Sequence, residues 1–188
     1  MNKIKLIFII LFLILVNSHS NSNELNNLFF KLKNAENFSK ATSIEKKIWN
    51  IWITNGSNQK NNSEMSKGVI LLNNGNLNYA LKVFLNLCEV EPEWAEPFNK
   101  VATIKFLQKD YLTSIKYIKL TLEKERRHFG AISGLAQINL RLGRFENALK
   151  NINEALKIHP FVGIKKIKPL LLEKLNKKEI NFHLNYIN

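Results

Sequence analysis

Hydrophobic residues recur at steps of three and four over most of the chain, which is the spacing of one face of an α-helix. Two such stretches, residues 94–107 and 111–122, are separated by the short polar turn QKD at 108–110. We therefore predict that they form a helix-turn-helix pair. The apolar positions that define the two faces are Phe98, Val101, Ala102, Ile104, Leu112, Ile115, Ile118 and Leu122.

The pattern repeats along the chain with a period of 34 residues. Similar turns, NNGN at 73–76 and RLGR at 141–144, stand one period before and one period after the QKD turn. A period between about 20 and 50 residues is typical of stacked-repeat proteins. The matching columns are Gly75, Lys109 and Gly143; Leu77, Tyr111 and Phe145; Ala80, Ser114 and Ala148; Leu81, Ile115 and Leu149; and Leu122 with Leu156.

Residues 61–162 resemble three consecutive tetratricopeptide repeats, at 61–94, 95–128 and 129–162. The resemblance implies an all-α fold, a right-handed α-solenoid of stacked helix-turn-helix repeats. In the middle repeat Arg126 replaces the proline expected near the end. The residues that carry the resemblance are small at the eighth position (Gly68, Ala102, Ala136) and at the twentieth (Ala80, Ser114, Ala148), with Pro92 and Pro160 at the thirty-second.

Three further strings, SIEKKIWNIW (43–52), AEPFNKVATI (95–104) and RHFGAISGL (127–135), are similar to a bacterial subfamily of exported tetratricopeptide-repeat proteins. With the repeats, this similarity covers nearly all of the chain after residue 20. It implies export and adds no activity.

The segments that flank the repeats are predicted to cap the stack, because terminal units must cover an otherwise exposed apolar face. Residues 21–60 contain two helical patterns, 24–32 and 41–52, and a polar linker at 55–62. Residues 163–188 contain the start of a closing helix at 169–175, and we expect the tail from Asn176 to be frayed.

Residues 1–20 have the layout of a secretory signal peptide. A basic start with Lys3 and Lys5 precedes an apolar run from Leu6 to Val16, and small polar residues follow it up to Ser20. The run is shorter than the ~20 residues of a membrane-spanning helix. We expect cleavage after Ser20 and export to the periplasm; the alternative is an uncleaved N-terminal membrane anchor.

The net charge of +13 raises the question of nucleic-acid binding. The lysines are scattered along a chain that is also rich in asparagine and isoleucine, so we expect a solvated basic surface and no nucleic-acid partner. Attraction to an anionic membrane surface stays open. Cys88 is the only cysteine, which excludes an internal disulfide, and its apolar neighbours predict a buried, inert thiol.

No pattern in the chain predicts catalysis, a cofactor or a metal site. His128, His159 and His183 each stand alone, without a second ligand at metal-binding spacing. No glycine-rich phosphate loop or catalytic triad pattern occurs. The acid-rich stretch Glu89, Glu91, Glu93 and Glu96 is interpreted as surface charge that could form an acidic contact patch.

The resemblance also implies a binding surface, because the first helix of each repeat lines a concave groove that suits an extended peptide or a helix. Some family members clamp a C-terminal carboxylate with Lys and Asn at set groove positions; Met65 and Val69 occupy two of those positions here, which argues against that clamp. The groove residues that we predict are Met65, Val69, Leu72, Glu96, Asn99, Thr103, Phe106, Ser133, Gln137 and Leu140.

From these features we predict a protein that is not an enzyme: a protein–protein interaction module or assembly adaptor of the cell envelope, with a protein or peptide partner in the groove. The alternative is a basic structural scaffold or homo-oligomer on an anionic membrane surface. The sequence leaves the oligomeric state open.

Overall fold

The structure is a computed structural model that describes residues 23–187, with side chains described for residues 23–177. The described part of the chain divides into two compact units, residues 23–51 and residues 52–187. The predicted signal peptide, residues 1–20, lies outside the described residues.

The first unit contains two helical segments. Residues 23–33 are helical, and α2 (Phe38–Ile53) follows and ends inside the second unit. Leu28, Leu32 and Ile48 are buried, as their helical spacing predicts. The side chain of Asn37 accepts a hydrogen bond from the backbone N–H of Lys40 at 2.9 Å, which satisfies one free donor at the start of α2.

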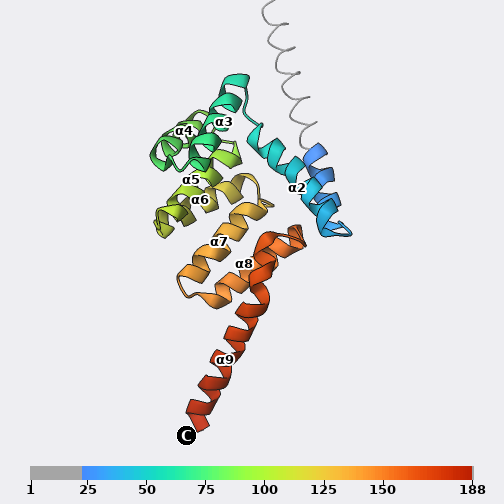
Figure 1. The fold of residues 1–188 in the computed structure, drawn as a ribbon, viewed down its shortest axis with the longest axis vertical. Helices are drawn as coiled ribbons and strands as arrows, with labels where there is room; N and C mark the ends of the chain where they lie inside the picture. Colours follow the sequence, from blue (N-terminus) through green and yellow to red (C-terminus); the bar gives the residue numbers. More distant parts are fainter. Residues whose placement is uncertain (1–22, 188) are drawn as a thin grey trace, which may run out of the picture. The chain divides into compact units, whose positions relative to one another are not determined.

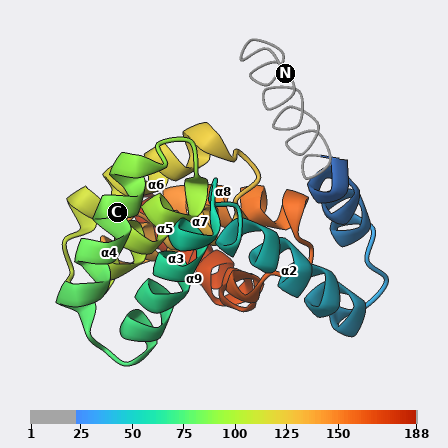
Figure 2. The same cartoon turned by 90° about the horizontal axis from the view of Figure 1, so that it is seen from above.

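The second unit contains three consecutive helix pairs, one within each predicted repeat. Each pair packs against the next one in chain order (Figures 1 and 2). These helices confirm the all-α class of stacked helix-turn-helix repeats. They are α3 (Gln59–Asn73) with α4 (Leu77–Val90), α5 (Ala95–Leu107) with α6 (Tyr111–Lys124), and α7 (Phe129–Arg141) with α8 (Phe145–Ile158).

The turn within each pair closes in the same way. A backbone N–H three residues past the helix end donates to a carbonyl five residues back: Asn76 to Leu71 at 2.9 Å, Asp110 to Lys105 at 2.9 Å, and Arg144 to Asn139 at 2.8 Å. The residue before each donor has a positive φ of 77° at Gly75, 61° at Lys109 and 69° at Gly143. Because a side chain is disfavoured there by about 1 kcal/mol or more, Lys109 occupies a position that suits glycine.

Small residues allow the two helices of a pair to approach closely. A Cβ added to Gly68 on α3 would lie 2.6 Å from the ring of Phe84 on α4. In the second pair, the hydroxyl of Ser114 on α6 donates to the carbonyl of Ala102 on α5 at 2.8 Å. The columns of small residues therefore mark where helices of one pair meet.

After the third pair, a short 3₁₀ helix η1 (Gly163–Ile167) leads into α9 (Lys168–Ile187). The expectation of a frayed tail from Asn176 is wrong, because α9 continues to Ile187. Residues 170–187 contain no Gly or Pro, the two residues that disfavour a helix most, so nothing in this segment stops the helix at Asn176. Across residues 23–187, no helix combines the length and apolar character needed to cross a bilayer.

Candidate functional site

The candidate site is a groove on the first helices of the second and third pairs, continued by η1. Five of the ten predicted groove residues line two hollows there. A hollow of about 130 Å³ between α5, α6 and α7 is lined by Asn99, Thr103, Phe106 and Gln137, together with small residues of α7. A second hollow, of about 550 Å³, lies between α7 and η1 and is lined by Gln137, Leu140, Arg141, Gly163, Ile164 and Ile167.

The chemistry of these hollows is mixed. Thr103 and Gln137 are exposed, while Phe106 and Leu140 are half-buried. Amide and hydroxyl groups can hydrogen-bond to a peptide backbone, and the apolar side chains can hold a side chain of a partner. Gln137 lines both hollows, so the two form adjoining parts of one surface.

The first repeat does not contribute to this surface as predicted. Met65 has no exposed surface and belongs to a core cluster with Phe84, Leu87 and Trp94. Val69 and Leu72 are half-buried and pack against the same cluster. Burial of these apolar side chains against α4 and α5 is more favourable than exposure in a groove. Met65 is therefore a core residue.

Glu96 and Ser133 are also withdrawn from the surface. Glu96 is fully buried and Ser133 is 8% exposed, and neither lines a hollow. Ser133 lies one turn before Gln137 on α7, and its hydroxyl has no hydrogen-bond partner among the described residues. The exposed groove therefore contains fewer of the predicted residues than we expect from the sequence.

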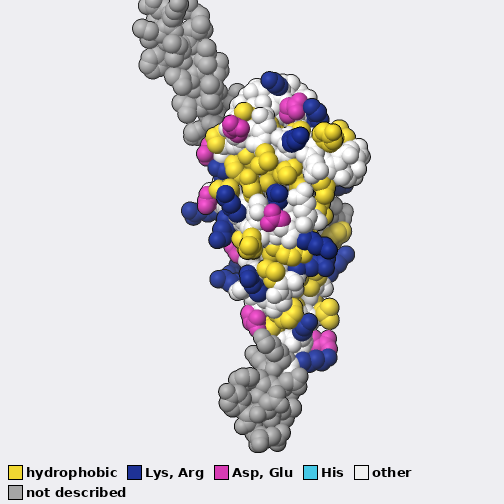
Figure 3. Space-filling model, turned by 90° about the vertical axis from the view of Figure 1, so that its left-hand side faces the viewer, with side chains coloured by type: hydrophobic (Ala, Val, Ile, Leu, Met, Phe, Trp, Pro, Cys, Tyr) yellow, Lys and Arg dark blue, Asp and Glu magenta, His cyan; other side chains and the backbone are white. Residues whose placement is uncertain are grey.

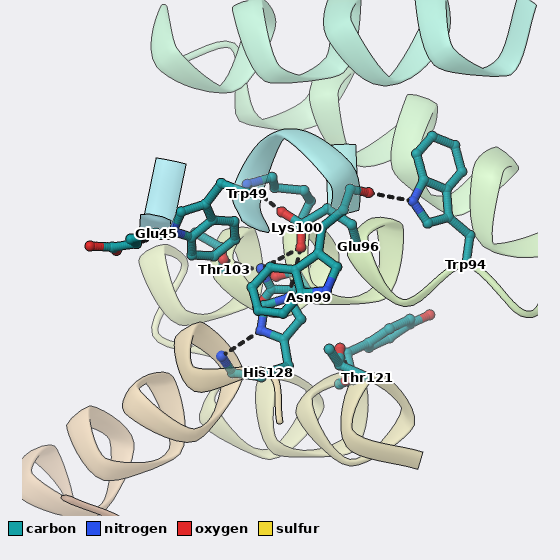
Figure 4. Close-up of polar contacts among 12 residues, drawn as sticks. Glu45, Trp49, Trp94, Glu96, Asn99, Lys100, Thr103, Thr121 and His128 are labelled. Carbon is teal, nitrogen blue, oxygen red and sulfur yellow. Dashed lines mark hydrogen bonds and ion pairs between the residues drawn. The ribbon is translucent and has the colours of Figure 1, made fainter. Parts of the chain in front are cut away.

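A buried polar cluster lies beside the groove, centred on the Glu96 carboxylate (Figure 4). One oxygen, Oε1, pairs with the Lys100 ammonium at 2.7 Å. The other, Oε2, lies 2.8 Å from Nε2 of His128 and accepts a hydrogen bond from the Asn99 amide at 3.2 Å. The cluster joins the first turn of α5 to the residue that precedes α7.

Both nitrogens of the His128 ring are used. Nδ1 accepts a hydrogen bond from the backbone N–H of Ala131 at 3.1 Å, so His128 caps α7. A nitrogen that accepts carries no proton, and Nε2 therefore bears the proton and donates it to Glu96. The ring stacks on Trp52, with centroids 4.0 Å apart and planes 8° apart. The buried His128 side chain therefore links the first turn of α5 to the start of α7.

The charge of Glu96 is balanced locally. Burial raises the pKa of its carboxyl, but Lys100 and His128 lower it by more, so that the pKa lies below the ordinary value of 4.5. Glu96 is therefore an ionised carboxylate engaged by its neighbours. The expectation that it belongs to an acidic surface patch is wrong.

Glu91, like Glu96, connects two segments of the chain, a contact that the sequence did not predict. Its carboxylate accepts hydrogen bonds from the backbone N–H of Ser57 and from the Asn61 amide. Burial raises the pKa of this carboxyl, but hydrogen bonds from the Ser57 hydroxyl, the Asn61 amide and the Ser57 N–H lower it by more. Glu91 thus ties the linker after α2 to the junction between the first and second repeats.

The remaining candidates for chemistry are placed as structural groups. Cys88 is half-buried, and burial raises the pKa of its thiol to about 12, as an inert thiol requires. His159 is buried at the end of α8 and accepts a hydrogen bond from the N–H of Phe161 at 3.3 Å. Within the described part of the chain, no three His, Cys, Asp or Glu side chains form a group that could hold a metal ion.

Comparison with known proteins adds a relative and two solved structures, although no family model matches the chain. A tetratricopeptide-repeat-containing protein of Rhizobium etli is 32% identical over 143 residues, which cover 76% of this chain and 70% of that protein.

The solved structures resemble the chain in fold. The first tetratricopeptide-repeat domain of Spaghetti (RPAP3), bound to an HSP90 peptide, has a TM-score of 0.59 at 18% identity and covers 63% of this chain and 94% of that one. The MamA protein has a TM-score of 0.50 at 14% identity and covers 85% of this chain and 90% of that one. Together with the relative and the three helix pairs, these likenesses show that the chain belongs to the tetratricopeptide-repeat family.

Proposed function

We propose that the protein is a non-catalytic binding module that holds a segment of a partner protein in the groove formed by α5, α7 and η1. The observation that carries the proposal is the pair of adjoining hollows lined by Thr103, Phe106, Gln137 and Leu140. Tetratricopeptide-repeat proteins are generally interaction modules, and the Spaghetti domain was solved with a peptide bound.

The groove offers both specificity and anchoring. Phe106 presents part of an aromatic ring, and aromatic side chains are enriched among residues that dominate binding energy. The ring of Tyr111 on α6 lies 5.8 Å from that of Phe106 and holds it in place. Gln137 has an exposed amide that can both donate to and accept from a peptide backbone.

The proposal includes a location. The layout of residues 1–20 supports export, and we propose that the module acts in the cell envelope as an adaptor or assembly factor. A fusion of the full chain to a reporter that is active only in the periplasm tests this part, and activity of a cytoplasm-only reporter would contradict it.

Alanine variants test the groove. Phe106→Ala and Gln137→Ala are expected to reduce recovery of the partner in affinity purification from envelope extracts, with proteins identified by mass spectrometry. Removing one anchor of an interface costs about 1–2 kcal/mol, or roughly five- to thirtyfold in affinity. Asn99 is left unchanged, because its amide contacts the buried Glu96.

The matched control is Tyr79→Ala, an aromatic residue that is 67% exposed on α4 and lines neither hollow. Recovery of the partner should be the same with this variant as with the unmodified protein. If Phe106→Ala and Gln137→Ala recover the partner as well as Tyr79→Ala does, the groove is not the binding surface.

A further inference from the structure

A second surface lies where the turns of the second and third repeats project from the stack. We define the turn edge as Leu107, Lys109, Leu112, Arg141, Leu142 and Arg144. The first three surround the turn between α5 and α6, and the others surround the turn between α7 and α8. Because α7 packs against both α5 and α6, the two turns lie at the same edge of the stack.

The turn edge exposes large apolar side chains. Leu112 is 79% exposed, Leu107 is 52% exposed and Leu142 is 38% exposed. Single exposed leucines need no explanation, but a group of them on neighbouring turns is typical of an interaction site. The turn of the first repeat, Asn73–Asn76, offers only polar residues and glycine at its tip, so the apolar group belongs to the later repeats.

Cations are interleaved with these leucines. Lys109, Arg141 and Arg144 are exposed, and none of them forms an ion pair within the described part of the chain. Of the two nearby carboxylates, Asp110 caps α6 through Thr113 and lies 3.8 Å from the Lys105 ammonium, and Glu146 lies in the first turn of α8. The edge therefore has a net positive charge.

Figure 3 views the stack from the side to which the turn between α7 and α8 points in Figure 1. Hydrophobic side chains and Lys or Arg side chains lie next to one another on this face along the length of the stack, and acidic side chains are interspersed among them.

Lys109 adds an independent observation. Its φ of 61° is a backbone conformation that the equivalent positions fill with Gly75 and Gly143. A residue held in a disfavoured conformation points to a function of its side chain. Here that side chain is a cation at the tip of the turn.

We propose that the turn edge binds the surface of an anionic lipid bilayer. Such a surface receives both kinds of side chain, because leucines enter the boundary of the acyl chains while cations remain among the phosphates. A nucleic acid would leave the leucines in water, since it attracts only the cations. The net charge of +13 over the full chain favours the same anionic surface.

The turn edge shares Arg141 with the peptide groove, and its other residues line neither hollow. The proposal does not depend on a peptide in the groove. It describes a module that lies on a membrane by the edge of its turns while its concave side stays available to a partner.

A fluorescent label at one turn tests the proposal in the full chain. The label is environment-sensitive and is attached at Leu112→Cys in a Cys88→Ala background, and the matched control carries it at Asn86→Cys, an exposed position of α4 outside the turn edge. Vesicles are made of phosphatidylcholine alone or mixed with phosphatidylglycerol. Because residues 1–20 contain an apolar run of their own, the position of the label decides which part enters the lipid.

With phosphatidylglycerol, the emission at position 112 should shift to shorter wavelength, and high salt should suppress the shift. The emission at position 86 should not change, and neither label should respond to phosphatidylcholine alone. Equal shifts at both positions, or none at 112, would overturn the proposal. Self-association through the turn edge without vesicles, seen as concentration-dependent mass in light scattering, would also overturn it.

A second variant separates folding from binding. Lys109→Gly should lower the partition onto phosphatidylglycerol vesicles about fivefold, as expected for the loss of one cation, while the thermal midpoint rises by a few degrees because the strain at φ 61° is relieved. Asn74→Gly is the control at a turn outside the edge and should leave the partition unchanged. An unchanged partition for Lys109→Gly contradicts the proposal.

Discussion

Glu96 has a fully buried carboxylate, and its two oxygens contact Lys100, Asn99 and His128. The burial of a charge is costly unless it is paired and hydrogen-bonded. Here the partners come from the same helix and from the cap of α7, so the cluster fixes the second repeat against the third. We infer that this cluster, which we call the Glu96 joint, fixes the distance between α5 and α7 and therefore the width of the groove.

Glu96→Gln tests this joint. The amide keeps the shape but removes the charge that Lys100 and His128 contact, and we expect a loss of about 2 kcal/mol in the free energy of unfolding by urea. Glu93→Gln is the control, because its side chain is 91% exposed and pairs with Lys124 only at 3.7 Å. The free energy of unfolding of that variant should stay within about 0.5 kcal/mol of the value for the unmodified protein. Equal stabilities for the two variants would show that the joint is unimportant.

The pH dependence of the same variant follows from the lowered pKa of Glu96. A carboxyl whose pKa is lower in the folded than in the unfolded state stabilises the fold above the unfolded pKa, and this stabilisation disappears as the pH falls through the folded value. The difference in stability between the unmodified protein and Glu96→Gln should therefore be constant near neutral pH and shrink below pH 4.5. Denaturant titrations at several pH values measure it, and a difference that grows on acidification would contradict this assignment.

At the scale of single residues, the repeat pattern predicted which position in the repeat each residue occupies, but it did not predict which side chains these residues contact. Glu96 and His128 are 32 residues apart; from the sequence, His128 was interpreted as isolated and Glu96 as part of an acid-rich surface stretch. Met65 has the right position in its repeat for a groove residue, but packing against Phe84 and Trp94 buries it. Such contacts depend on distances between helices, which periodicity does not report.

At the scale of the helix pairs, close packing depends on small residues at fixed positions. In the first pair, Gly68 leaves room for the rings and methyl groups of Phe84 and Val83. These positions were predictable from the 34-residue columns, because every repeat needs a small residue where its helices meet. The helix ends were also predictable from the turn residues, apart from the extension of α9.

Gly68→Ala should destabilise the protein by about 1–3 kcal/mol, because the new methyl group would lie 2.6 Å from the Phe84 ring. Gly163→Ala is the matched control: it has an ordinary φ and open space around the added Cβ. Thermal unfolding followed by circular dichroism compares the two. Similar midpoints for both variants would mean that α3 and α4 do not pack as closely as described.

Gly143→Ala is predicted to cost about 1 kcal/mol even though no atom lies within 4 Å of the added Cβ. The cost comes from the φ of 69° alone, which disfavours any side chain. Its unfolding midpoint in urea should fall, while that of Gly163→Ala should not. A neutral result would show that the turn relaxes to another conformation.

At the scale of the whole molecule, the family and the fold class were predictable from the repeat, and the relative of Rhizobium etli supports both. The boundaries of the binding surface were not, because groove positions in the first repeat are filled by core residues while η1 extends the groove at the other end. We therefore propose that the second and third repeats and η1 bind the partner.

Site-specific photocrosslinking tests this central claim most directly. A photoreactive amino acid replaces Gln137, which lines both hollows, or Asn86 on the outside of α4 as the control. After irradiation of cells that express the full chain, we expect a covalent adduct with one protein from position 137 and none from position 86. No adduct at 137, or the same adduct from both positions, would contradict it.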